Sequence, residues 1–229
     1  MLTLIYAVST ILGLLGLWVF DRIPQSWLLD YGVTLEEWSG KSLKPPRINL
    51  WPEGITIVVL FALASTGVYY LHGGDYRRIG FAIIILWLLM LIVIADIIYG
   101  ILPDQIIIVI GMTGLVFQIV GSGGYDFQWN LLEEPFLGAL VCGGGLFSLS
   151  AFTALLSGGE TVGMGDCKLL CALGILHGPL DGLWVLLFAI LISGLYFAAA
   201  VMIGHLKLDS YAPFAPHIAL SSSLWLIFG

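Results

Sequence analysis

The sequence predicts an all-α, polytopic membrane protein built as a helix bundle of seven or eight transmembrane helices. Of its 229 residues, 59% are hydrophobic and only 10% are charged, a balance that a water-soluble globular domain is not expected to have. Apolar runs alternate with short polar segments along the whole chain. Because a membrane-spanning helix needs about 20 mainly apolar residues, each long run is a candidate span.

Five of these runs predict one span each. In chain order they cover residues 2–20, 55–71, 79–102, 105–120 and 135–156. A longer run, 169–204, is interrupted at His177, Gly178 and Pro179, which predicts a short helix followed by a full span. The last run, 214–228, supplies the final helix.

The polar segments between the runs are too short for a separate folded core, so we expect a single integral membrane domain over residues 1–229. The longest of them, 21–54, holds the basic residues Arg22, Lys41, Lys44 and Arg47. Since basic residues favour the cytoplasmic side, this segment is predicted to be a cytoplasmic loop along the membrane surface. Alternation of the spans then places Asp96 and residues 157–168 in the cytoplasm, whereas Arg77 and Arg78 fall outside, against the rule.

Charge and cysteine usage exclude two classes of ligand. The net charge is −7 and no cluster of Lys and Arg exists, so nucleic acid is not expected as a partner. The cysteines Cys142, Cys167 and Cys171 form no CxxC pair and are interpreted as reduced packing residues. We therefore predict no metal and no cofactor.

Asp96 is the only charged residue between positions 79 and 103. A carboxylate at membrane depth costs a few kcal/mol unless it is protonated, paired or near water, so such a residue is a functional-site hypothesis by default. The alternative is that Asp96 only ends a helix at the membrane interface.

Asp166 follows a glycine-rich segment. Gly163 and Gly165 flank Met164, which would allow close backbone approach or φ values closed to other residues. Asp166 stands where the next apolar helix begins, and taken alone it could be an N-cap. Taken together, two membrane carboxylates on one face can meet and share a proton, so that one acts as acid and the other as base on a water, the arrangement that hydrolyses peptides.

Three motifs resemble those of the type IV prepilin peptidase family, which includes the preflagellin peptidases and belongs to the GxGD membrane aspartic proteases. The first is Asp96 with Pro103-Asp104 eight positions later; the second is GxGD continuing into KLL, at 163–170; the third is the proline-rich stretch 213–220. The resemblance implies that Asp96 and Asp166 are catalytic. It also implies supporting or substrate-binding roles for Gly163, Gly165, Asp104, Lys168, Pro213 and Pro216.

The resemblance further implies a substrate and a location. The expected partners are type IV prepilin, pseudopilin or archaellin-like precursors with a basic leader and a hydrophobic helix, cleaved at the cytoplasmic face of the inner (cytoplasmic) membrane. The two CxxC pairs of longer bacterial members are absent, and Ile97-Ile98-Tyr99-Gly100 replaces the basic residues that usually follow the first aspartate. N-methylation with S-adenosylmethionine, found in many bacterial members, is left open.

Three rival functions are considered. Presenilin and signal-peptide-peptidase proteases share a GxGD segment but usually have Tyr before the first aspartate, where this chain has Ala95. A proton-coupled transporter would also use membrane carboxylates, and a non-catalytic assembly factor would need neither. Two other polar residues are interpreted as structural, Glu160 as a solvated loop charge and His217 as a packing histidine.

Overall fold

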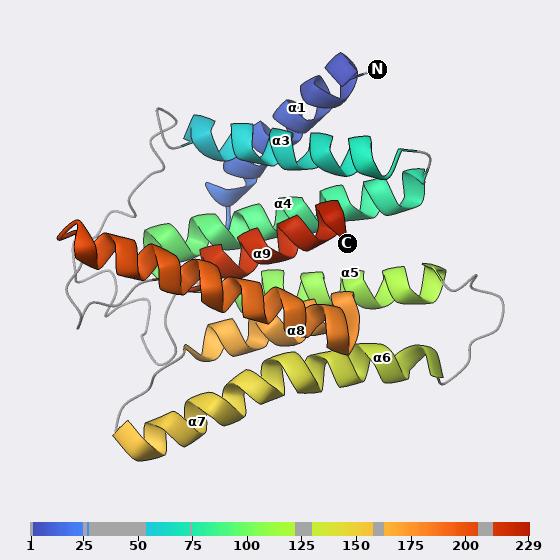
Figure 1. Ribbon diagram of the computed structural model, residues 1–229. Helices are drawn as coiled ribbons and strands as arrows, with labels where there is room; N and C mark the ends of the chain where they lie inside the picture. Colours follow the sequence, from blue (N-terminus) through green and yellow to red (C-terminus); the bar gives the residue numbers. More distant parts are fainter. Residues whose placement is uncertain are drawn as a thin grey trace. The chain divides into compact units, whose positions relative to one another are not determined.

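The computed structural model describes residues 2–24, 27, 54–73, 75–121, 130–157, 163–205 and 213–229. All regular secondary structure in these residues is helical (Figure 1), which confirms the all-α prediction for them. Most of the predicted loop 21–54 and Glu160 lie outside the described residues. The elements are α1 Leu2–Phe20, α3 Ile55–Leu71, α4 Tyr76–Tyr99, α5 Asp104–Gly121, α6 Asn130–Ala139, the π-helical turn η3 Leu140–Gly144, α7 Gly145–Ser157, α8 Met164–Met202 and α9 Ala215–Phe228.

Three helical stretches are long and apolar enough to cross a bilayer, judged by length and composition. They are α4, the continuous stretch Leu132–Leu155 through α6, η3 and α7, and α8. The apolar stretches of α1, α3, α5 and α9 are shorter. The protein is thus an apolar membrane protein with three candidate spans in its described part, and the count of seven or eight stays a prediction.

Helix boundaries agree with the apolar runs except where a polar or special residue intervenes. The bounds of α1 and α3 are the predicted ones. Helix α4 begins at Tyr76 because Asp75 caps it, accepting hydrogen bonds from the backbone N–H groups of Arg77 and Arg78 at 3.1 and 3.2 Å. It ends at Tyr99 because Gly100 has the left-handed φ of 64°, a common helix terminator.

The fifth predicted span, 135–156, nearly coincides with the candidate span Leu132–Leu155, but the helix that contains it starts earlier. Helix α6 begins at Asn130 and includes Pro135. Pro135 lies in the second turn of α6, where it removes one backbone N–H donor from the helix.

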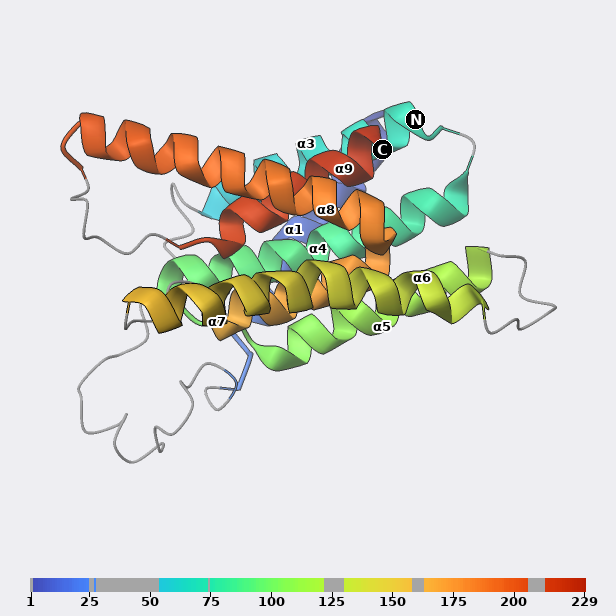
Figure 2. The ribbon, with the colours of Figure 1, turned by 60° about the horizontal axis from the view of Figure 1, so that its bottom comes forward.

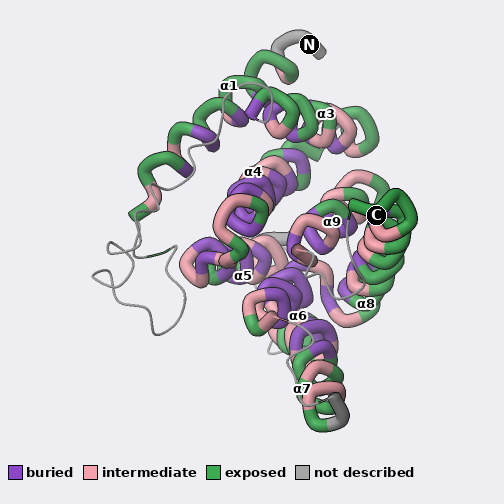
Figure 3. The backbone as a smooth tube through the Cα atoms, turned by 90° about the vertical axis from the view of Figure 1, so that its left-hand side faces the viewer, coloured by how far each residue is buried: buried purple, intermediate pink, exposed green. Residues whose placement is uncertain are grey.

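Contacts divide the chain into two compact units, residues 1–103 with 226–229 and residues 104–225. In the first unit, α1 packs against α3 and α4. The indole Nε1 of Trp87 donates a hydrogen bond to the carbonyl of Leu12 at 3.0 Å, and the rings of Phe20 and Tyr99 lie 6.2 Å apart. Half of the α4 residues are buried, most of them between Ile85 and Asp96, and Figure 3 shows the buried part of this helix in purple.

In the second unit, α8 is two helical legs. Gly178 has φ 78° and ψ 179°, which is not helical, and Pro179 follows it. The legs run in opposite directions on either side of this break (Figures 1 and 2). A Cβ on Gly182 would lie 3.6 Å from the Cα of Gly174, so the legs touch near the turn. The predicted interruption of the run 169–204 is confirmed.

Glycines bring α6 and η3 into close contact with the first leg of α8. A Cβ on Gly138 would lie 2.7 Å from the carbonyl carbon of Gly174, and one on Gly143 would lie 2.7 Å from the backbone nitrogen of Cys171. Side chains at these glycines would collide with backbone atoms, so the helices can approach this closely only because the side chains are absent. Gly143 is thus a packing residue, whereas a Cβ on Gly145 would have nothing within 4 Å.

Candidate active site

Asp96 lies on the buried face of α4, one turn before the helix ends. Its residue exposure is 4%, and Ala95 beside it is 0% exposed, whereas Ile97 is 60% exposed. The helix continues to Tyr99, and the Gly100 N–H donates to the Asp96 carbonyl at 2.8 Å. An aspartate that only ended a helix at the interface would be exposed, so the burial favours the functional interpretation.

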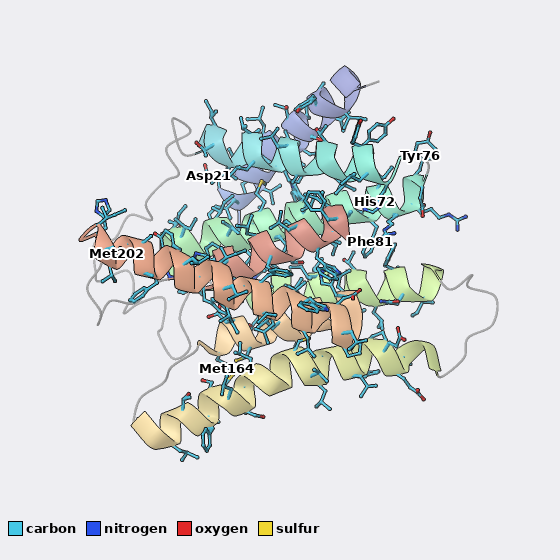
Figure 4. All side chains as sticks on the ribbon, in the orientation of Figure 1. Asp21, His72, Tyr76, Phe81, Met164 and Met202 are labelled. Carbon is cyan, nitrogen blue, oxygen red and sulfur yellow. The ribbon has the colours of Figure 1, made fainter. Side chains whose placement is uncertain are left out.

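Asp166 lies in the first turn of α8, 3% exposed. Figure 4 labels Met164, the first residue of the helix, two positions before it. The N-cap is Gly163, whose carbonyl accepts a hydrogen bond from the Asp166 N–H at 3.1 Å. The alternative that Asp166 is the N-cap is therefore wrong. A carboxylate in the first turn is favoured by the helix dipole.

Gly163 and Gly165 do not use the left-handed region. Gly163 has φ −63° and ψ 139°, extended values that any residue adopts, and Gly165 lies within α8. In the described part of the chain, positive φ occurs at Gly100, Gly178 and Gly204. The expectation of φ values closed to other residues is wrong for this pair, and the expectation of close backbone approach stays a prediction.

Asp104 and Lys168 form an ion pair within the second unit. The Lys168 ammonium Nζ lies 2.9 Å from each carboxylate oxygen of Asp104. Their side chains are 36% exposed for Lys168 and 33% for Asp104, so water screens the pair and its contribution to stability is at most about 1 kcal/mol. Sequence reasoning selected both residues but did not pair them.

Pro213 and Pro216 flank the start of α9. Pro216 is the second residue of the helix, a first-turn position where the missing N–H has no helical acceptor. The Pro213 carbonyl lies 3.2 Å from His217 Nδ1. The His217 ring packs 5.1 Å from the ring of Tyr196 in α8, which supports the interpretation of His217 as a packing residue.

A group of polar contacts around the break at Gly178 was missed by sequence reasoning. His177 Nε2 lies 2.9 Å from Ser222 Oγ, Ser221 Oγ donates to the Val185 carbonyl at 2.7 Å, and Gln118 Nε2 donates to the Leu176 carbonyl at 3.2 Å. They join α5, both legs of α8 and α9. Three consecutive serines, 221–223, in an apolar run were the available signal.

The predicted site residues are distributed over both units. Asp96 belongs to the first unit, and Asp104, Asp166, Lys168, Pro213 and Pro216 belong to the second. The structure brings Asp104 and Lys168 together, and the meeting of Asp96 with Asp166 stays a prediction. Among the described residues no three His, Cys, Asp or Glu side chains are placed to hold a metal ion, and the absence of a metal or cofactor likewise stays a prediction.

Comparison with known proteins gives several relatives. The chain is 30% identical over 183 residues to the prepilin leader peptidase/N-methyltransferase of Bacillus subtilis (strain 168), covering 80% of this chain and 68% of that protein. It is 27% identical over 176 residues to the protein of the same name from Dichelobacter nodosus, a match that covers 76% of this chain and 57% of that protein. It is also 30% identical over 148 residues to the protein of that name from Aeromonas salmonicida (strain A449), a match that covers 65% of this chain and 49% of that protein. The chain thus spans about half to two thirds of these relatives' length. No solved structure shows significant similarity to it.

The type IV leader peptidase family matches residues 83–198. Asp96, Asp104, Asp166 and Lys168 all fall inside the match, whereas the proline-rich stretch 213–220 lies beyond it. The match covers half of the chain, and the predicted resemblance is confirmed. The chain belongs to the type IV leader peptidase family.

Proposed function

We propose that this protein is a membrane aspartic endopeptidase that removes the leader of prepilin-type precursors, with Asp96 and Asp166 as its catalytic pair. One observation carries the proposal. Two carboxylates, each less than one-tenth exposed, lie in apolar helices inside the stretch that matches a peptidase family. Burial of this kind is costly and calls for a functional reason.

The chemistry requires one protonated and one ionised carboxyl group. The ionised carboxylate takes a proton from water, and the water oxygen attacks the carbonyl carbon of the scissile peptide bond. The protonated carboxyl then supplies the proton that the departing amine needs when the C–N bond breaks. Two carboxyl groups held close together share one proton, because both cannot ionise.

The substrate follows from the names of the relatives and from charge. The proteins to which the chain is similar are named prepilin leader peptidases. A basic leader would be attracted to a chain of net charge −7, and a hydrophobic helix after the leader would lie in the same bilayer as the enzyme. We place the site at the cytoplasmic face of the inner membrane, where basic loop residues orient the chain.

The test is co-expression with a prepilin-type precursor in a host that lacks its own leader peptidase, followed by mass measurement of the precursor's N-terminus. The wild-type chain is expected to remove the leader. Asp96→Asn and Asp166→Asn should each slow cleavage by at least about 100-fold, the usual contribution of an acid or base. The same mass reports whether a methyl group is added, the second activity in the relatives' names, which would use S-adenosylmethionine.

Two matched variants control for the loss of an acidic residue. Asp181 is exposed in the second unit, and Asp75 is exposed at the start of α4, where asparagine can also cap the helix. Asp181→Asn and Asp75→Asn should therefore cleave at the wild-type rate. A precursor that keeps its leader beside the wild-type chain, or loses it beside the double variant Asp96→Asn/Asp166→Asn, would contradict the proposal. A proton-coupled transporter would give the first of these outcomes.

A further inference from the structure

We infer that the ion pair between Asp104 and Lys168 is a positioning device that holds the first turn of α8, and with it Asp166, in axial register against α5. The inference rests on the proposed role of Asp166 in peptide cleavage. Both Oδ atoms of Asp104 lie 2.9 Å from Lys168 Nζ. Asp104 and Lys168 are positioning residues in this account, and Asp166 is the group that contacts the reacting atoms.

The turn that carries Asp166 is buried, but it has no side-chain cap at its N-terminal end. Its N-cap, Gly163, has no side chain to bond the first free N–H groups, and the second helical residue, Gly165, adds no packing surface. Glycine also has the widest backbone freedom of any residue. Lys168 lies two positions after Asp166 in the same helix, so an anchor at Lys168 limits the movement of the Asp166 backbone.

Beyond this turn, small residues set the distance between α5 and α8, and one hydrogen bond, from Gln118 Nε2 to the Leu176 carbonyl at 3.2 Å, defines their register at the far end. A Cβ on Gly111 would lie 3.6 Å from the Cβ of Ala172, and one on Gly114 would lie 3.1 Å from the Cβ of Leu176. Helix surfaces of small residues are smooth and allow close approach. The order of these contacts shows that α5 and the first leg of α8 run in the same direction, with the ion pair at their N-terminal ends.

The ion pair adds a directional contact at the N-terminal end, where Asp166 lies, to the Gln118 hydrogen bond at the far end. Its two bonds to one ammonium have a preferred length and direction, so a slide of α8 along α5 would break them. A misplacement of a reacting group by about 1 Å can cost on the order of 100-fold in rate. The predicted consequence of breaking the pair is therefore a loss of rate out of proportion to the loss of stability.

The experiment measures cleavage kinetics with membrane-embedded protein for Asp104→Asn, Lys168→Met, their double variant and Lys168→Arg. Each single neutral variant should lower kcat by about 10- to 100-fold with KM within about twofold of wild type. The double variant should be no slower than the slower single one, because the two residues act as a unit. Lys168→Arg should keep kcat within about threefold, because a guanidinium also binds a carboxylate through two bonds.

Controls separate positioning from stability and from charge. Asp181→Asn, an exposed acidic change in the same unit, should keep the wild-type kcat. Rates are divided by the amount of folded protein, and a wild-type kcat in Asp104→Asn and Lys168→Met would overturn the inference. So would a displaced pH–rate profile with little change at its maximum, which would mean that Lys168 acts on Asp166 through charge.

Two further outcomes are distinguished. If Lys168→Met does not accumulate, the comparison of Lys168→Arg with Lys168→Gln replaces it, and equal kcat values in those two variants overturn the inference. If the wild-type chain does not cleave the precursor, the proposed function fails. If the wild type cleaves, Asp166→Asn does not, and the ion-pair variants cleave normally, only the positioning role fails.

Discussion

The end of α4 and the start of α8 hold the two candidate catalytic aspartates in different ways. Helix α4 is an uninterrupted apolar helix with a side-chain cap at its start and a left-handed glycine after its end. The N-cap of α8 is Gly163, which has no side chain to cap the helix, and the first turn contains a second glycine, Gly165. Both aspartates are buried, but Asp96 lies in an unbroken apolar helix, whereas Asp166 lies in a turn that has two glycines near its start and no side-chain cap. The two helices should respond differently to the same kinds of substitution.

The largest expected effect is on the cleavage rate. Shifting each carboxyl group, rather than removing it, compares how tightly the two aspartates are held. Asp96→Glu and Asp166→Glu each push the carboxyl group outward by one methylene. Around Asp96 the neighbours Ile94 and Ala95 are buried, so we expect Asp96→Glu to lose at least about 100-fold in kcat. The loss in kcat of Asp166→Glu should be about tenfold smaller than that of Asp96→Glu, because the backbone of the glycine-rich turn can adjust. Equal losses, measured as single-turnover cleavage rates, would contradict the distinction.

The next effect concerns the packing that supports α8. A Cβ on Gly174 would lie 2.5 Å from the carbonyl carbon of Gly138 and 2.9 Å from the nitrogen of Ala139. Because backbone atoms cannot move aside, Gly174→Ala should lower the free energy of unfolding by about 3 kcal/mol. The matched control is Gly194→Ala in the second leg, where nothing lies within 4 Å and alanine should stabilise by up to about 1 kcal/mol. Thermal unfolding in detergent micelles measures both, and a stabilised Gly174→Ala would contradict the close packing.

The sequence predicts much of the helical layout because the signal is local. The bounds of α1 and α3 follow from the lengths of their apolar runs, and the break at Gly178 follows from a glycine and a proline inside a run. The start of α4 was missed because the Asp75 cap extends the helix by three polar or aromatic residues before the apolar run. The π-helical turn Leu140–Gly144 carries no periodic signal that separates it from an α-helix.

The candidate site is predictable only in part for the same reason. Asp96 and Asp166 stand out because a charge in an apolar run is costly wherever the chain folds. The pairing of Asp104 with Lys168 spans 64 positions, and the contact of His177 with Ser222 spans 45. Such pairs arise from the packing of α5, α8 and α9, which no local pattern in one sequence reports.

A smaller effect is expected at the polar contacts around the break in α8. Ser222 is 0% exposed, and its Oγ lies 2.9 Å from His177 Nε2. Ser222→Ala leaves a half-buried imidazole nitrogen without this partner and should cost about 1–2 kcal/mol in the free energy of unfolding. Ser223→Ala is the control, because Ser223 Oγ bonds only a carbonyl of its own helix, Ala219, among the contacts seen here. Equal unfolding temperatures for the two variants would exclude a stabilising role of the His177 contact.

The smallest effect is expected at the N-cap of α4, the helix that carries Asp96. Asp75→Ala removes the acceptor of the hydrogen bonds from the Arg77 and Arg78 N–H groups, so we expect a loss of about 1 kcal/mol. Asp75→Asn keeps an acceptor oxygen and should lose only a few tenths of a kcal/mol. Because Asp96 lies near the other end of α4, among buried residues, cleavage should stay within about twofold of wild type in both variants, in contrast to the variants of the α8 turn. A tenfold fall in kcat for Asp75→Ala would show that α4 also depends on its end contacts, and that the two aspartates are held alike.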